Sequence, residues 1–103
     1  MKKEIFTHGD LDKLSGTAIL KFYTDWCVPC KVVDKVLQNE IFEEYDFTVF
    51  EIDADSEFEL TEKFLVNGIP TLIFLKDGRE VGRMSSSSIT ATDIINGLDW
   101  LKP

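Results

Sequence analysis

The sequence has few residues of the kinds that bind metal ions or nucleic acids. Its 103 residues include two cysteines, one histidine, and eleven lysines and arginines against nineteen acidic residues, so the formal net charge is −8. A structural zinc site normally needs four ligands, and His8 is far from both cysteines in the sequence, so no metal site is expected. An acidic domain is a poor electrostatic match for phosphate backbones, so nucleic-acid binding is not expected either.

Long apolar segments are also absent. No stretch approaches the ~20 apolar residues of a membrane-spanning helix, and the chain begins with Lys2, Lys3 and Glu4 rather than with the apolar run of a secretory signal. We therefore expect a cytoplasmic protein with no membrane partner. Its acidic surface is expected to keep it monomeric. Structural disulfides are rare in the cytoplasm, so the two cysteines need another explanation.

The apolar residues predict a single α/β domain over residues 1–103. A chain of this length fits one domain, and strand-like stretches alternate with stretches of helical periodicity. Strands are predicted over 3–7, 17–24, 47–52, 71–75 and 80–84, and helices over 10–14, from the cysteine pair to about 41, over 56–65 and over 90–101. This order, β-α-β-α-β-α-β-β-α, predicts a mixed sheet with helices on both faces.

Several local predictions accompany this outline. A helical stripe that is expected to face the core consists of Val32, Val33, Val36, Leu37 and Ile41. Ser56 and Glu59 have the spacing of a capping box that begins the following helix, and Thr90 with Asp93 offers a second cap. The Asp-Gly pair at 77–78 is typical of a hairpin turn.

The strongest chemical signal is the pair Cys27 and Cys30, where a predicted strand ends and a long helix begins. A helix N-terminus carries unpaired amides and a partial positive charge, which lower the pKa of a cysteine from ~8.5 toward neutrality. Residues three apart share a helix face, within reach of a disulfide, and Pro29 presets the first turn. We predict that Cys27 attacks a disulfide and that Cys30 resolves the mixed disulfide.

Two other interpretations of the cysteine pair remain open. Two cysteines three apart form half of a zinc site in some proteins, although only His8 is present here as a further ligand. The spacing can also arise by chance between two buried thiols. The position between strand and helix favours redox chemistry over both alternatives.

Three segments together resemble the thioredoxin family. They are 26–31 (WCVPCK), 68–71 (GIPT) and 76–78 (KDG), and the resemblance extends from about 17 to 101. It implies the thioredoxin fold and a Cys27–Cys30 dithiol that reduces disulfides in client proteins. It also implies a thioredoxin reductase-like electron donor, no cofactor, and a cis peptide bond between Ile69 and Pro70 facing the cysteines.

The resemblance also implies a surface that binds clients. The backbone N–H and C=O of Ile69, beside Pro70, would pair with an extended client segment as an added strand. An apolar rim around Cys27 would consist of Trp26, Val28, Pro29, Val66 and Ile69. Ordinary packing in the core is the alternative interpretation for Val66 and Trp26.

Two departures from the family pattern concern client access. Val28 stands where the family usually has glycine, and its β-branched side chain stiffens the turn and shields Cys27. Residues 85–88 are four serines where the family tends to have a glycine in the client groove. We interpret them as a solvated loop, with hydrogen bonding to a client as the alternative.

A third departure reverses two charges. Lys21 and Glu51 stand where the family usually has a buried aspartate and a lysine on the neighbouring strand. We hypothesise a charge-reversed pair, because a lone buried ammonium would be costly. A cation below Cys27 and Cys30 would favour thiolate and make the disulfide more oxidising. In the alternatives, Lys21 extends to solvent, or Glu51 handles the proton that the aspartate handles in the family.

Two classes of function are compatible with these residues. In the first, the protein is a thiol–disulfide oxidoreductase that reduces disulfides in clients, and Val28 and Lys21 leave an oxidase-like or isomerase-like potential open. In the second, it is a binding module or subunit of a larger complex without turnover of its own. The presence of both cysteines with Trp26 and Pro29 favours the first.

Overall fold

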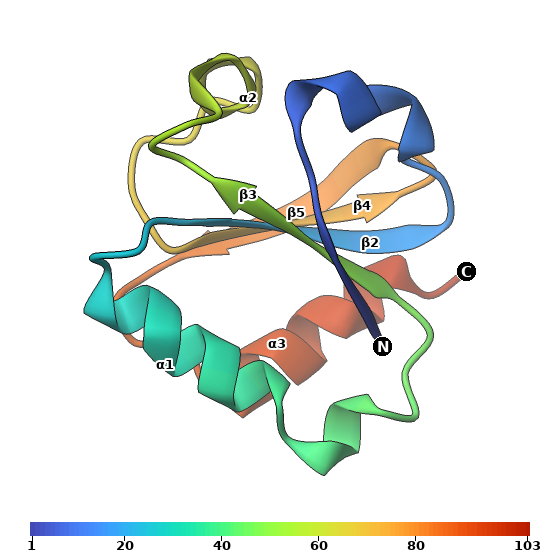
Figure 1. Ribbon diagram of the computed structural model, residues 1–103. Coiled ribbons are helices and arrows are strands. Elements are labelled where there is room, and N and C mark those ends of the chain that lie inside the picture. The colour runs from blue at the N-terminus through green and yellow to red at the C-terminus, as the bar shows by residue number, and fades with distance from the viewer.

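The computed structural model describes all residues, 1–103, as a five-stranded sheet with helices on both faces (Figure 1). The strands are β1 (Lys2–Ile5), β2 (Thr17–Tyr23), β3 (Thr48–Asp53), β4 (Thr71–Lys76) and β5 (Arg79–Ser85). The helices are α1 (Val28–Leu37), α2 (Phe58–Lys63) and α3 (Ala91–Leu98), with 3₁₀ segments η1 (His8–Lys13), η2 (Glu40–Phe42) and η3 (Asp99–Leu101). The predicted order of elements is confirmed, with the first helix in the 3₁₀ form. None of the helices is long and apolar enough to cross a membrane.

The sheet order β1-β3-β2-β4-β5 places β2 at the centre. β1 and β2 each pair with β3 in parallel, whereas β4 runs antiparallel to β2 and β5 antiparallel to β4. Figure 1 shows α1 and α3 against one face of the sheet, and α2 and η1 against the other. The loop that joins β2 to α1 therefore begins at the carboxyl end of the central strand. This loop contains the first cysteine.

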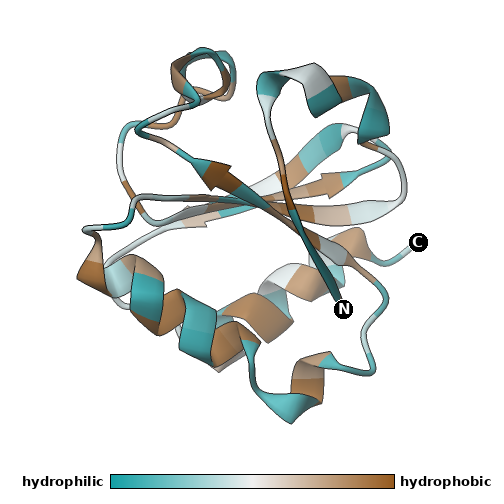
Figure 2. Ribbon diagram, in the orientation of Figure 1, coloured by the Kyte–Doolittle hydropathy of each residue, from teal (hydrophilic) through white to brown (hydrophobic).

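Alternation along the central strands divides the core into two clusters. Ile19, Leu72 and Phe74 belong to the cluster on the α1 and α3 side, and Leu20 and Ile73 to the cluster on the opposite side. All five side chains are completely buried. Figure 2 shows hydrophobic colouring along the strands of the sheet and an alternation of hydrophobic and hydrophilic colouring along the helices. Each such side chain contributes roughly 1.5–3 kcal/mol by its removal from water, so β2 and β4 form a rigid base for the loop above them.

Two of the local predictions are confirmed. Asp77 and Gly78 both have positive φ, 50° and 82°, between β4 and β5, as a tight primed hairpin turn requires. At the start of α3, the Thr90 hydroxyl accepts from the Asp93 amide at 3.2 Å, and the Thr90 amide donates to the Asp93 carboxylate at 2.9 Å. This reciprocal pair is the capping box expected from the sequence.

The expected core-facing stripe after the cysteines is only partly correct. Val33 and Leu37 are buried, but Val32 and Ile41 are 48% and 41% exposed. α1 ends at Leu37, and Ile41 lies in the separate segment η2, where Phe42 is the buried residue. Val32 lies on the solvent side of α1 because Cys30, Val33 and Leu37 define the face that packs on the sheet.

The capping box predicted for α2 is wrong. The N-cap is Glu57, and its side chain makes no capping hydrogen bond. The Ser56 hydroxyl instead donates to the Asp53 carbonyl at 3.4 Å, so it stabilises the turn after β3. The helix also ends earlier than expected, at Lys63, because Leu65 adopts a left-handed conformation with φ 54°.

A close approach between α3 and β4 makes Gly97 a sensitive position. A Cβ atom at Gly97 would lie 2.6 Å from Cζ of Phe74, which is completely buried. We expect Gly97→Val to lower the free energy of unfolding by about 2–3 kcal/mol, since an overfilled core must shift its neighbours. Urea denaturation measures the change. Asn96→Val at the adjacent exposed position is the control and should cost under about 0.5 kcal/mol; equal losses would contradict the packing argument.

Candidate active site

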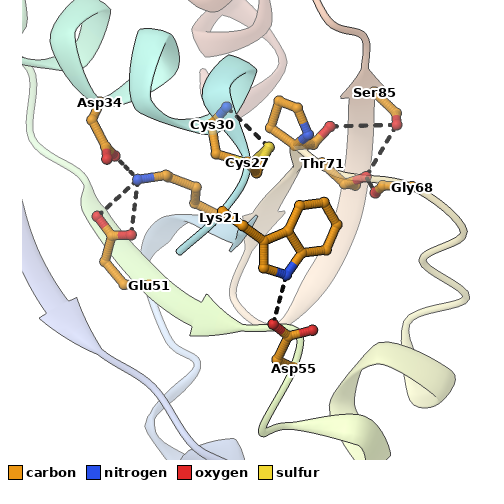
Figure 3. Close-up of a disulfide and its surroundings, with 11 residues drawn as sticks. Lys21, Cys27, Cys30, Asp34, Glu51, Asp55, Gly68, Thr71 and Ser85 are labelled. Atoms are coloured by element: carbon orange, nitrogen blue, oxygen red, sulfur yellow. Dashed lines mark hydrogen bonds and ion pairs between the residues drawn. A yellow bond between two sulfur atoms is a disulfide. The ribbon is translucent and has the colours of Figure 1, made fainter. Parts of the chain in front are cut away.

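The two cysteines form a disulfide at the N-terminus of α1 (Figure 3). Their Cα atoms are 5.2 Å apart. Cys27 is the N-cap residue of the helix, and its Sγ accepts a hydrogen bond from the Cys30 amide at 3.2 Å. Pro29 occupies the first turn, where a missing amide hydrogen leaves no partner unpaired. In the reduced protein this amide and the positive end of the helix dipole stabilise a thiolate at Cys27.

The residues beside the disulfide differ in exposure. Cys27 itself is only 4% exposed, whereas Trp26 and Val28 on either side of it are 70% and 67% exposed. The Trp26 indole donates from Nε1 to Oδ2 of Asp55 at 2.9 Å, which ties the ring to the segment after β3. Trp26 is therefore not packed in the core. Val66, in contrast, is part of the core cluster on the α2 side. This agrees with the alternative interpretation of Val66 as an ordinary core residue.

Hydroxyl groups hold the turn before β4. The Ile69–Pro70 peptide bond is cis, as the resemblance implied. The Thr71 hydroxyl donates to the Gly68 carbonyl at 2.5 Å, and the Ser85 hydroxyl donates to the Pro70 carbonyl at 3.4 Å. Ser85 is the last residue of β5 and also lies 3.1 Å from the Thr71 hydroxyl. Ser85 therefore supports the turn from the neighbouring strand. This role distinguishes Ser85 from the other three serines of 85–88, which follow the end of β5.

Lys21 and Glu51 form a buried ion pair. They are register partners on the parallel strands β2 and β3, which brings two residues thirty positions apart side by side. Nζ of Lys21 lies 2.9 Å and 3.2 Å from the two carboxylate oxygens of Glu51. The Lys21 side chain is 1% exposed, so it does not extend to solvent. Burial lowers the pKa of the Lys21 ammonium, and the hydrogen bond to Glu51 partly opposes this change.

A second carboxylate contacts the Lys21 ammonium and was not predicted from the sequence. Asp34 of α1 also contacts the Lys21 ammonium, and its side chain is 34% exposed. Lys3 of β1 completes the cluster with its Nζ 3.2 Å from Oε1 of Glu51. In Figure 3 the Lys21 ammonium points toward both carboxylates. The available sequence signal was the spacing of four residues from Cys30 to Asp34, which places both on one face of a helix.

Asp55 was missed as well. It follows the end of β3, as Trp26 follows the end of β2. The carboxyl ends of parallel neighbouring strands meet at one sheet edge, so the two residues were candidates for contact. Neither the indole nor the carboxylate carried a recognisable motif of its own.

Comparisons with known proteins agree on one family, and the matches span from two thirds to nearly all of the chain. The Thioredoxin family model matches residues 2–99. The thioredoxin of Chlamydia trachomatis is 41% identical over 69 residues, which are 67% of this chain and 68% of that protein. The thioredoxin of Mycoplasmoides gallisepticum is 31% identical over 80 residues, 75% of this chain and 80% of that protein.

Two solved structures are similar in fold. The reduced thioredoxin pre-protein of Schistosoma mansoni superposes with a TM-score of 0.84 at 24% identity and covers 99% of this chain and 100% of its own. A mutant thioredoxin from Halobacterium salinarum gives a TM-score of 0.82 at 25% identity, covering 99% of this chain and 93% of its own. The matched regions include Cys27 and Cys30.

Proposed function

Since the chain belongs to the thioredoxin family and is a thiol–disulfide oxidoreductase, we propose that Cys27 is its attacking sulfur and Cys30 its resolving sulfur. The observation that carries this assignment is the Cys27 Sγ at the helix N-terminus, where it accepts from the Cys30 amide at 3.2 Å. A sulfur in that position is stabilised as a thiolate, the form that attacks disulfides.

The reaction requires two exchanges of sulfur. The Cys27 thiolate attacks one sulfur of a client disulfide, and the second client sulfur leaves as a thiolate that takes a proton from solvent. The Cys30 thiol then loses its proton and attacks Cys27 Sγ, so that the mixed disulfide breaks and the other client thiolate leaves. The client gains two electrons, and the protein is left with the Cys27–Cys30 disulfide of Figure 3.

We assign client binding to the apolar surface around Cys27. Trp26 and Val28 are exposed beside the sulfur, and the Ile69–Pro70 turn supplies backbone groups for an extended client segment. Val66 supports this surface from the core rather than lining it, since its side chain is 9% exposed. The high exposure of Trp26 and Val28 supports the assignment, because apolar side chains at that exposure gain most when a partner covers them.

We assign the tuning of the thiol pKa to Pro29, Lys21 and Glu51. Pro29 shapes the first turn of α1, and the buried Lys21 ammonium contacts Asp34 of the same helix and pairs with Glu51. A buried positive charge favours a nearby thiolate. Glu51 limits this effect because it neutralises the ammonium.

The partners follow from the reaction. We propose client proteins with accessible disulfides and a thioredoxin reductase-like donor that returns two electrons to the disulfide. Such recycling operates in a reducing compartment such as the cytoplasm. One monomeric domain holding both sulfurs is sufficient for it, without a cofactor.

Reduction of insulin by dithiothreitol, followed as turbidity, tests the proposed function. The protein is expected to accelerate precipitation well above the reagent alone, and Cys30→Ser is expected to return the rate to that of the reagent. A parent protein that gives no acceleration would favour a thioredoxin-fold binding module without turnover.

A further inference from the structure

The carboxylate of Asp34 links the helix of the active site to the buried ammonium. Asp34 contacts Lys21 from α1, while Glu51 contacts it from β3. We propose that Asp34 is a positioning residue that holds the Lys21 ammonium against α1 and, by cancelling part of its charge, sets the redox equilibrium of Cys27 and Cys30. This inference rests on the proposed function, since it concerns the same two sulfurs.

The charges around Lys21 explain why a second carboxylate matters. The Lys21 side chain is 1% exposed, so protein groups rather than water balance its charge. The groups that face it are Glu51, Asp34 and the ring of Tyr23, whose centroid is 5.4 Å from Nζ. Lys3 is bound to Glu51 and is 55% exposed, so solvent screens much of its charge. One buried ammonium thus faces two carboxylates, and the cluster does not act on the sulfurs as a lone cation.

Helix geometry connects Asp34 to the sulfurs. Cys30 and Asp34 are four residues apart in α1, so their side chains share a face with Cβ atoms roughly 5–6 Å apart. A negative charge at that distance disfavours a thiolate, and a positive charge favours it. The charge of Asp34 therefore raises the pKa of the thiols, while the charge of Lys21 lowers it. Because a stabilised thiolate stabilises the dithiol, a variant without the Asp34 charge becomes more oxidising.

The decisive experiment compares two substitutions with opposite expected signs. The rate of alkylation of the reduced protein by iodoacetamide, measured against pH, gives the pKa of the reactive thiol. Asp34→Asn is expected to lower this pKa by about one unit. This is the low end of the shift that a charge at this distance produces, because Asp34 is partly exposed and solvent screens its charge. Lys21→Met is expected to raise it. Equilibration with glutathione should show the disulfide about tenfold easier to reduce in Asp34→Asn, as one pKa unit corresponds to tenfold.

Two further variants separate charge from shape. Asp34→Glu restores the charge and is expected to return the pKa toward the parent value. Asp99→Asn makes the same change in net charge at an exposed pair, 2.9 Å from Lys102, and is expected to change nothing. Circular dichroism establishes that each variant is folded, and Asp34→Ser replaces Asp34→Asn should the latter unfold.

Several results would overturn the inference. They are a pKa in Asp34→Asn equal to that in Asp99→Asn, a shift in Asp34→Glu as large as in Asp34→Asn, or equal directions of shift in Asp34→Asn and Lys21→Met. None of these depends on turnover of insulin. A failure of the inference is thus distinguishable from a failure of the proposed function, which appears only as the absence of accelerated reduction by the parent protein.

Discussion

Cys30→Ser is expected to convert the protein into a trap that captures a client through Cys27 and does not release it. The substitution keeps the backbone amide of residue 30, which donates to Cys27 Sγ in the parent at 3.2 Å, so the attacking thiolate keeps its stabilisation. A hydroxyl cannot displace the client sulfur, so the second exchange stops. Turnover in the dithiothreitol assay should fall to the reagent rate. When the reduced variant is incubated with client in the absence of dithiothreitol, a mixed disulfide of one protein and one client should accumulate, visible by intact mass and by non-reducing electrophoresis.

Cys27→Ser is the matched control for this trap. Cys27→Ser removes the sulfur next to the exposed Trp26 and Val28. The sulfur that remains belongs to Cys30, a residue that is only 2% exposed. This variant should form no adduct under the same conditions, and dithiothreitol should release the client from Cys30→Ser. Adducts of equal yield on both variants, or on neither, would contradict the assignment of Cys27 as the attacking sulfur.

The features that the sequence predicts well depend on local chemistry or on strand register. The turn at Asp77–Gly78 has two positive φ angles that an Asp-Gly pair accepts readily. The placement of Cys27 at a helix start was predictable because a strand-like run ends at residue 24 and a helical pattern follows the cysteines. The contact of Lys21 with Glu51 was predictable because the resemblance to the thioredoxin family implies facing positions on neighbouring strands, and the two residues are register partners.

The features that escaped prediction depend on how α1 and α2 sit on the sheet. Helical periodicity predicted that both Val32 and Val33 face the core. In the structure, the packing of α1 on the sheet buries Val33 and leaves Val32 exposed. Ser56 had the spacing of a cap, but the turn after β3 engages its hydroxyl with the Asp53 carbonyl. Asp34 reaches Lys21 only because α1 packs against one face of the sheet. Spacing along a sequence defines a helix face, whereas tertiary packing decides what that face meets.

The second large effect is expected at Glu51. Glu51→Gln removes the carboxylate that binds the Lys21 ammonium through both oxygens, at 2.9 and 3.2 Å. Loss of one partner of a buried ion pair typically costs about 3–5 kcal/mol, because the remaining charge stays buried without compensation. Asp34 remains in contact with Lys21, so we expect the low end, about 3 kcal/mol, in urea denaturation of the oxidised protein.

A double-mutant cycle tests whether this loss comes from the stranded ammonium. Lys21→Met removes the buried charge, so the double variant Lys21→Met/Glu51→Gln is expected to recover at least half of the stability lost in Glu51→Gln. Glu80→Gln is the surface control: it breaks the pair with Arg83, whose Nε lies 2.6 Å from Oε2 of Glu80, and should cost under about 1 kcal/mol. If Glu51→Gln costs no more than Glu80→Gln, or if the double variant is less stable than Glu51→Gln, then the Lys21 ammonium does not depend on Glu51 for its charge balance. The charge-reversed pair would then have no part in stabilising the sheet beneath the disulfide.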